Sequence, residues 1–223
     1  MFRVRLRLLP AIATLVVVAL PSSLLGQACL GQPSFALNHL QMTAGANFDK
    51  TSTSFGANFI SGSESVFGGI GIGGATFDGF EGSSLLAGAT AGFQVPLTDG
   101  GAQICPIVSA QFGFGPNDFD GLGTDFTSRG VNFGIAAGGE MFKSERIAVL
   151  PSASIAFAYA EGRFDGVGGS VTTSDTYALA GLALGFLISD KLAVRPSVSF
   201  PIGLEDADPV FGIGFALNYG GRR

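Results

Sequence analysis

The last segment of this chain alternates large and small side chains, and this alternation constrains the fold more than any other feature. Phe211, Ile213, Phe215, Leu217 and Tyr219 are separated by glycine, alanine and asparagine. Because successive side chains of a β-strand point to opposite faces, a period of two places all the bulky residues on one face. A soluble sandwich also alternates, so the pattern predicts strands without choosing their environment.

Ten segments show this alternation or a weaker form of it, which predicts an all-β fold. The predicted strands are 40–48, 54–61, 66–76, 84–96, 102–114, 130–142, 147–160, 176–188, 192–203 and 210–219. Short turns near 61–65, 98–101, 143–146 and 189–191 alternate with longer loops at 77–83, 115–129 and 161–175. This order predicts a closed, antiparallel, up-and-down β-barrel of ten strands, or of eight if the weak first hairpin is absent.

The first 28 residues are typical of a secretory signal peptide. Three arginines in the first seven positions precede an apolar stretch at 8–20, and Gly26 and Ala28 provide small residues for cleavage. We therefore expect export through the Sec pathway. Cleavage after Ala28 would leave a periplasmic tail at 29–39 and one barrel domain at 40–223.

Charge is scarce along the whole chain. Charged residues make up 13% of it, about half the share in a typical soluble domain. Cleavage would remove three of the 12 basic residues and none of the 17 acidic ones, leaving a net charge of −8 that argues against nucleic-acid binding. The near absence of charge inside the strands favours a transmembrane barrel whose apolar face meets lipid. The competing interpretation is a soluble secreted β-sandwich that acts as a binding module.

Together with the signal peptide and the alternating loop lengths, the closing pattern Phe-x-Ile-x-Phe-x-Leu-x-Tyr resembles the small outer-membrane β-barrels of Gram-negative bacteria, of the OmpA/OmpX type. The resemblance implies an outer-membrane location, contact with lipid and lipopolysaccharide, and insertion by the barrel-assembly machinery. It also implies a monomer. The chain departs from the pattern by ending on Gly220-Gly221-Arg222-Arg223 instead of an aromatic residue.

The chain has two cysteines, Cys29 and Cys105. An even number of cysteines in an oxidising compartment indicates a disulfide. The predicted topology places both on the periplasmic side, which supports this bond. The alternative is lipidation of Cys29 as the first residue of the mature protein.

The loop at 115–129 is a candidate cation site. Asp118, Asp120 and Asp125 lie close together around glycines, and oxygen ligands at such intervals are typical of calcium loops. The segment lacks the closing glutamate of an EF-hand, and an ordinary turn explains it equally. We expect weak binding of Ca²⁺ or Mg²⁺ here and no other cofactor.

Two charged residues, Glu140 and Arg195, are predicted to face the barrel interior within strands. The simplest hypothesis is an ion pair that neutralises both charges inside the lumen. A role in gating or ion selectivity is the alternative.

The sequence offers no catalytic constellation. His39 is the single histidine, and no G-x-S-x-G motif is present. We therefore expect no enzyme. A structural or surface-interaction role is the principal hypothesis, and a narrow passive channel for small solutes is the alternative, because the predicted lumen face is rich in small residues.

Overall fold

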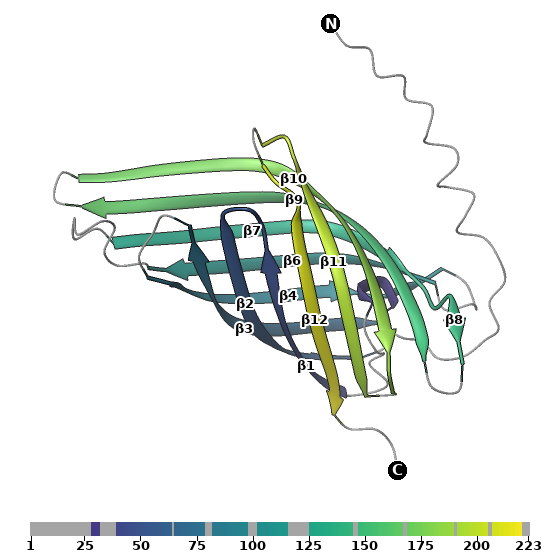
Figure 1. Cartoon of the computed structure of the whole chain (residues 1–223). Helices are drawn as coiled ribbons and strands as arrows, with labels where there is room; N and C mark the ends of the chain where they lie inside the picture. Colours follow the sequence, from purple (N-terminus) through teal and green to yellow (C-terminus); the bar gives the residue numbers. More distant parts are fainter. Residues whose placement is uncertain are drawn as a thin grey trace, which may run out of the picture.

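A computed structural model describes residues 28–31, 39–63, 65–78, 82–97, 102–115, 125–144, 147–166, 169–189, 191–204 and 207–219. These residues form a closed antiparallel β-barrel of ten long strands (Figure 1). The prediction of an up-and-down barrel with ten strands is therefore confirmed.

The long strands run up and down in chain order. They are β1 (His39–Phe48), β2 (Ser52–Gly62), β3 (Val66–Phe77), β4 (Ser84–Phe93), β6 (Gln103–Phe114), β7 (Asp125–Gly138), β9 (Ala148–Gly166), β10 (Gly169–Leu187), β11 (Leu192–Ile202) and β12 (Val210–Tyr219). Two short strands come directly after β4 and β7 in the chain. β5 (Val95–Pro96) pairs with β6, and β8 (Phe142–Lys143) pairs with β9. A 3₁₀ turn, η2 (Ala28–Leu30), precedes the barrel. Among the described residues, no helix is long and apolar enough to cross a membrane.

Pairing of the first and last strands closes the barrel. The register runs from Leu40 opposite Tyr219 to Phe48 opposite Phe211. Inside this seam the Gln41 Nε2 donates a hydrogen bond to the Asn218 Oδ1 at 2.8 Å. We call the end of the barrel where β1 begins and β12 ends the terminus end, and the opposite end the loop end.

The expected loop at 161–175 is wrong. β9 and β10 continue through it as a paired hairpin, which in Figure 1 reaches beyond β1 and β2 at the loop end. Residues 169–177 of β10 pair with β9 but not with β11, whose pairing begins at Ala178. Valine and threonine favour extended backbone, while exposure on both faces removes the apolar alternation by which strands are recognised.

Large apolar side chains cover the outer face of the barrel. Ile72 is 70% exposed and Phe157 is 66% exposed, and the bulky residues of β12 point outward as predicted. On β7 and β9 this apolar surface ends at Val131 and Tyr159, and charged residues follow toward the loop end. The outer face therefore carries an apolar band.

The buried core lies inside the barrel, mainly at the terminus end. Buried side chains from nearly every strand line the lumen there: Gln41, Ile60, Phe67, Gln94, Gln103, Cys105, Ala136, Leu150, Ala193, Ala216 and Asn218. Toward the loop end, many of the described lumen residues are glycine, serine or asparagine, among them Asn47, Asn132, Gly181 and Ser199. The two halves of the interior thus differ in packing.

Candidate functional site

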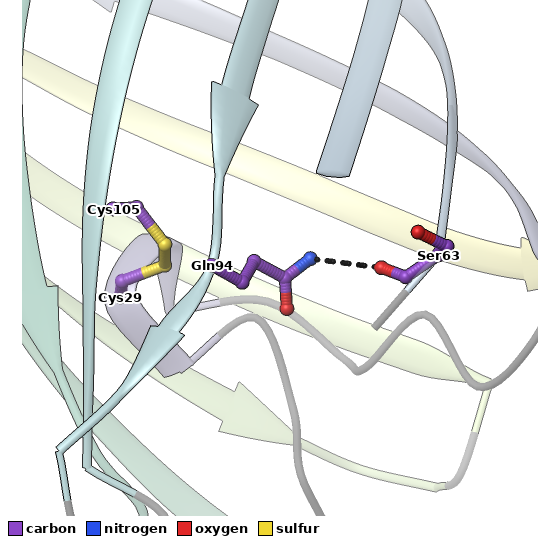
Figure 2. The surroundings of a disulfide bond; sticks show 4 residues. All are labelled: Cys29, Ser63, Gln94 and Cys105. Carbon is purple, nitrogen blue, oxygen red and sulfur yellow. Dashed lines mark hydrogen bonds between the residues drawn. A yellow bond between two sulfur atoms is a disulfide. The ribbon is translucent and has the colours of Figure 1, made fainter. Parts of the chain in front are cut away.

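A segment at the start of the described chain lies inside the barrel. Cys29 of η2 forms a disulfide with Cys105 of β6, with the two Cα atoms 6.0 Å apart, and both side chains are buried. Figure 2 shows the bond connecting the 3₁₀ turn to the inner side of the strand. The disulfide predicted from the sequence is therefore present, and it holds residues 28–31 in the lumen.

Apolar side chains surround the disulfide. Ile60, Phe67 and Ala136 form a buried cluster with the two cysteines, and Leu30 and Ile107 pack against it. These residues come from η2, β2, β3, β6 and β7, so the cluster crosses part of the lumen. Burial of apolar surface stabilises this contact in addition to the covalent bond.

On its other side, the N-terminal segment packs against β9, β10 and β11. Gly31 has a φ of 62°, which favours glycine, and a Cβ there would lie 3.3 Å from the Leu150 carbonyl oxygen and 3.4 Å from the Arg195 Nε. A Cβ on Gly185 would overlap the Gly31 carbonyl oxygen. The segment therefore extends from β6 to the wall formed by β10 and β11.

Buried amide side chains complete the packing near the plug formed by residues 28–31. Gln41, Gln103 and Asn218 are almost fully buried at the terminus end. The Gln94 side chain begins beside the disulfide and its Nε2 donates to the Ser63 carbonyl oxygen at 3.5 Å, as Figure 2 shows. The plug and this polar layer together occupy part of the lumen at the terminus end.

A cavity of about 310 Å³ lies on the loop-end side of the plug. Cys29 and Leu30 form part of its wall, and the remaining lining comes mainly from small and polar residues of β6, β7, β9, β10 and β11. Two glycines provide space for it: a Cβ on Gly181 would lie 2.6 Å from the Ser154 Oγ, and one on Gly212 would lie 2.6 Å from the Ser197 Oγ. The lining is therefore mixed, with serine, asparagine and arginine side chains beside isoleucines and leucines.

Among the described residues that line this cavity, Arg195 contributes the one charged side chain. Its Nε is buried and has no hydrogen-bond partner. The structure does not bring Arg195 and Glu140 together: no hydrogen bond or ion pair joins them. Glu140 lies in the segment between β7 and β8, where Gly139 and Met141 still bond β9 through their backbone N–H groups. Arg195 instead lies against Gly31 of the plug.

Charged residues of the loop end form pairs on the outer face. Arg129 Nη2 donates to Glu161 Oε2 at 2.8 Å, and the Tyr159 hydroxyl donates to the same oxygen at 2.7 Å. Hydrogen bonds from Arg129 and then Tyr159 lower the pKa of Glu161. Two residues further along β9, Arg163 forms a bidentate pair with Asp165. These exposed pairs mark where the apolar band ends.

The predicted cation site can be placed only in part. Asp118 and Asp120 lie outside the described residues. Asp125 begins β7 opposite Asp165, whose carboxylate binds Arg163. Within the described ranges, no cluster of three potential metal-ligating side chains occurs. The cation site stays a prediction.

Comparison with known proteins concerns the fold alone. No protein-family model and no curated protein matches the chain. The β-barrel domain of OprF from Pseudomonas aeruginosa is 15% identical, with a TM-score of 0.38 over 82% of this chain and 98% of that one. Ail of Yersinia pestis is 13% identical, with a TM-score of 0.44 over 82% and 100%. Neisserial surface protein A is 9% identical, with a TM-score of 0.38 over 82% and 97%.

The solved structures similar to this chain are outer-membrane β-barrels. These similarities assign no role to any residue of the lumen.

The predicted disulfide indicated that the N-terminal tail is fastened to the barrel, but the sequence showed neither that residues 28–31 lie inside the lumen nor that a cavity lies beside them. A further signal was glycine, with Gly31 two residues after Cys29 and Gly185 within a predicted strand. Neither glycine identifies its partner, because their contact depends on how the barrel closes.

Proposed function

We propose that this protein is an outer-membrane barrel that acts at the cell surface and does not form an open pore. The apolar band supports membrane insertion, because burying so much exposed apolar surface requires a nonpolar partner. The band measures about 26 Å along β12 and about 36 Å along β9, which corresponds to about 20–28 Å across the membrane for a strand tilt of about 40°. These lengths fit the apolar core of a bilayer.

In this proposal the terminus end faces the periplasm and the loop end faces outward. Short turns and both chain termini belong to the periplasmic side of such barrels. An oxidising periplasm is also consistent with the disulfide at the terminus end. Lipid and lipopolysaccharide would then surround the band, and the barrel-assembly machinery would insert it.

The observation that carries the proposal is the disulfide-bound segment 28–31 inside the lumen. It contacts β6 through Cys105 and reaches β10 through Gly185, with the apolar cluster beside it. A solute passing through the barrel would have to displace this packed segment. The projecting β9–β10 hairpin, with its exposed serines and threonines, supports a role in surface interaction.

Single-channel recording in a planar bilayer tests this function. The oxidised protein, refolded in detergent, should insert without conductance. Cys29→Ser/Cys105→Ser is the matched variant, because it keeps both side-chain volumes but frees the plug, and it should show transient openings. Stable open steps of defined size from the oxidised protein would contradict the proposal.

The cavity favours a second candidate, the narrow passive channel, because it provides a volume inside the barrel that is lined partly by polar side chains. The same recording separates the two functions. Membrane location is tested independently: recovery in outer-membrane fractions and heat-modifiable migration are expected, whereas purification as a soluble monomer without detergent would contradict it.

A further inference from the structure

We propose that the lumen cavity binds a small oxyanion, such as inorganic phosphate or a carboxylate, beside the Arg195 guanidinium. The proposal goes beyond the surface role and does not depend on conductance. It rests on the charge of the cavity, on its free hydrogen-bond donors and on its size.

The described lining of the cavity carries a positive charge without a countercharge. Arg195 belongs to that lining, and no acidic residue among the described residues does. Its Nε is buried without a partner, and no described carboxylate interacts with the side chain electrostatically. The N-terminal segment cannot supply one either, because Asp49 is the first acidic residue of the chain. Since an arginine stays protonated in proteins, the charge persists inside the barrel.

Arg195 is partly buried and its Nε has no partner, so the charge lacks part of its solvation, and a bound anion offsets that loss. Arginine suits an oxyanion because its planar guanidinium can donate two parallel hydrogen bonds to carboxylate or phosphate oxygens. Glu140 does not fulfil this role, since it does not contact Arg195. The site therefore selects for a negative ligand from solution.

Serine hydroxyls around Arg195 provide further donors. Ser197 and Ser199 alternate with it on the lumen face of β11, and Ser152 and Ser154 line the same cavity from β9. These four hydroxyls make no hydrogen bond within the described structure, so they are available to a ligand. Gly181 keeps the space between the two strands open, because a Cβ there would lie 2.6 Å from the Ser154 Oγ and 3.7 Å from the Ser199 Oγ.

The size of the cavity limits the ligand. A volume of about 310 Å³ corresponds to roughly ten waters at about 30 Å³ each. Phosphate or a short carboxylate fits with part of its hydration shell. The plug closes the terminus end, so the ligand would enter from the loop end.

Titration of the refolded, oxidised protein tests the site. Inorganic phosphate, acetate and chloride are added separately at matched ionic strength, and the side-chain Nε–H resonance of Arg195 is followed by NMR. We expect a saturable shift with an oxyanion and none with chloride. A response to phosphate alone or to acetate as well identifies the ligand class. An equal response to chloride, or no saturable response, would overturn the proposal.

Two variants localise the binding. Arg195→Gln removes the charge, and the matched control Arg163→Gln removes an exposed arginine already paired with Asp165. Isothermal titration calorimetry measures phosphate binding to both variants. The affinity of Arg195→Gln should be about tenfold or more weaker than that of the wild type, as expected for the loss of a charged hydrogen bond, and the affinity of the control should be unchanged.

If Arg195→Gln does not refold, Asn132→Asp provides a second test of phosphate binding. Asn132 lines the cavity, and this nearly isosteric change places a carboxylate there that competes for Arg195. It should weaken phosphate binding about tenfold or more. Asn58→Asp, on β2 and not in the cavity lining, is the matched control and should bind normally. Unchanged affinity in Asn132→Asp would overturn the site.

Discussion

Gly31 and Gly185 meet backbone to backbone inside the barrel, although 28–31 and β10 are far apart in the sequence. A side chain on Gly185 would overlap the Gly31 carbonyl oxygen. The ladder between β10 and β11 is interrupted beside this contact, where Pro196 has no N–H to donate. The absence of both side chains allows this close approach, while the disulfide fixes the other side of the plug.

Gly185→Ala should loosen the plug. Its Cβ forces the segment away from β10, at a cost of about 1–3 kcal/mol for overpacking. The rate at which dithiothreitol reduces the Cys29–Cys105 bond should therefore rise, as followed by alkylation and mass spectrometry. Gly214→Ala is the control, because its Cβ would make only ordinary contacts, the nearest at 3.8 Å from the Arg195 carbonyl oxygen. Equal rates in both variants would refute the packing described for Gly31.

Removal of the disulfide should lower the free energy of unfolding. The bond spans 76 positions of the sequence, and closing such a loop restricts the unfolded chain by up to about 4 kcal/mol. We expect the free energy of unfolding of Cys29→Ser/Cys105→Ser to be lower by about 2–4 kcal/mol. Urea unfolding in detergent, monitored by resistance to trypsin, measures this difference. Reduced wild-type protein should unfold at the same urea concentration as the variant. A variant as stable as oxidised wild type would show that the bond does not stabilise the barrel.

Arginine substitution on the outer face tests which residues contact lipid. Ile70 is 68% exposed near the middle of the apolar band on β3, and Ile70→Arg should cost about 2–4 kcal/mol in phospholipid. Thr76 lies on the same face near the loop end, and Thr76→Arg should cost about 0–1 kcal/mol. Equilibrium unfolding in phospholipid vesicles measures both. Equal costs at the two positions would argue against a membrane-spanning band.

The β1–β2 turn should weaken in acid. Burial tends to raise the pKa of Asp49, but hydrogen bonds from Ser52 and Thr51 outweigh it and leave the pKa below its ordinary value of 3.8. The Asp49 Oδ1 accepts from the Thr51 N–H at 2.8 Å and from the Ser52 N–H at 2.7 Å. A lowered pKa means that the ionised carboxylate stabilises the turn above pH 3.8 and that this contribution is lost as the pH falls through the folded value.

Amide exchange of Thr51 and Ser52 measures this effect. Exchange protection, corrected for intrinsic exchange rates, should decrease on acidification in the wild type. Asp49→Asn keeps an acceptor without a titrating charge, so its protection should not change with pH in this range. A pH-independent wild-type turn would contradict the assigned role of the Asp49 carboxylate.

Much of the barrel could be predicted because strand alternation is a local property of the sequence. Phe211 and Ile213 point outward in β12, and most predicted strands agree with the structure within a few residues. The strands at 161–175 were not predicted, because an exposed hairpin needs no apolar face. The pairing of Thr172 with Arg163 is evident only from the three-dimensional structure. The resemblance to outer-membrane barrels is confirmed at the level of the fold.

By itself, the sequence predicted an up-and-down barrel, the outward direction of the bulky residues and the side on which both cysteines lie, but it left the strand count open between eight and ten. Each depends on period-two patterning or on the order of short and long connections, which neighbouring residues encode. Only the tertiary structure decided what lies in the lumen. Contact between Gly31 and Gly185, and the separation of Arg195 from Glu140, depend on barrel closure. Closure brings distant strands across one interior, and no local pattern records which of their side chains meet.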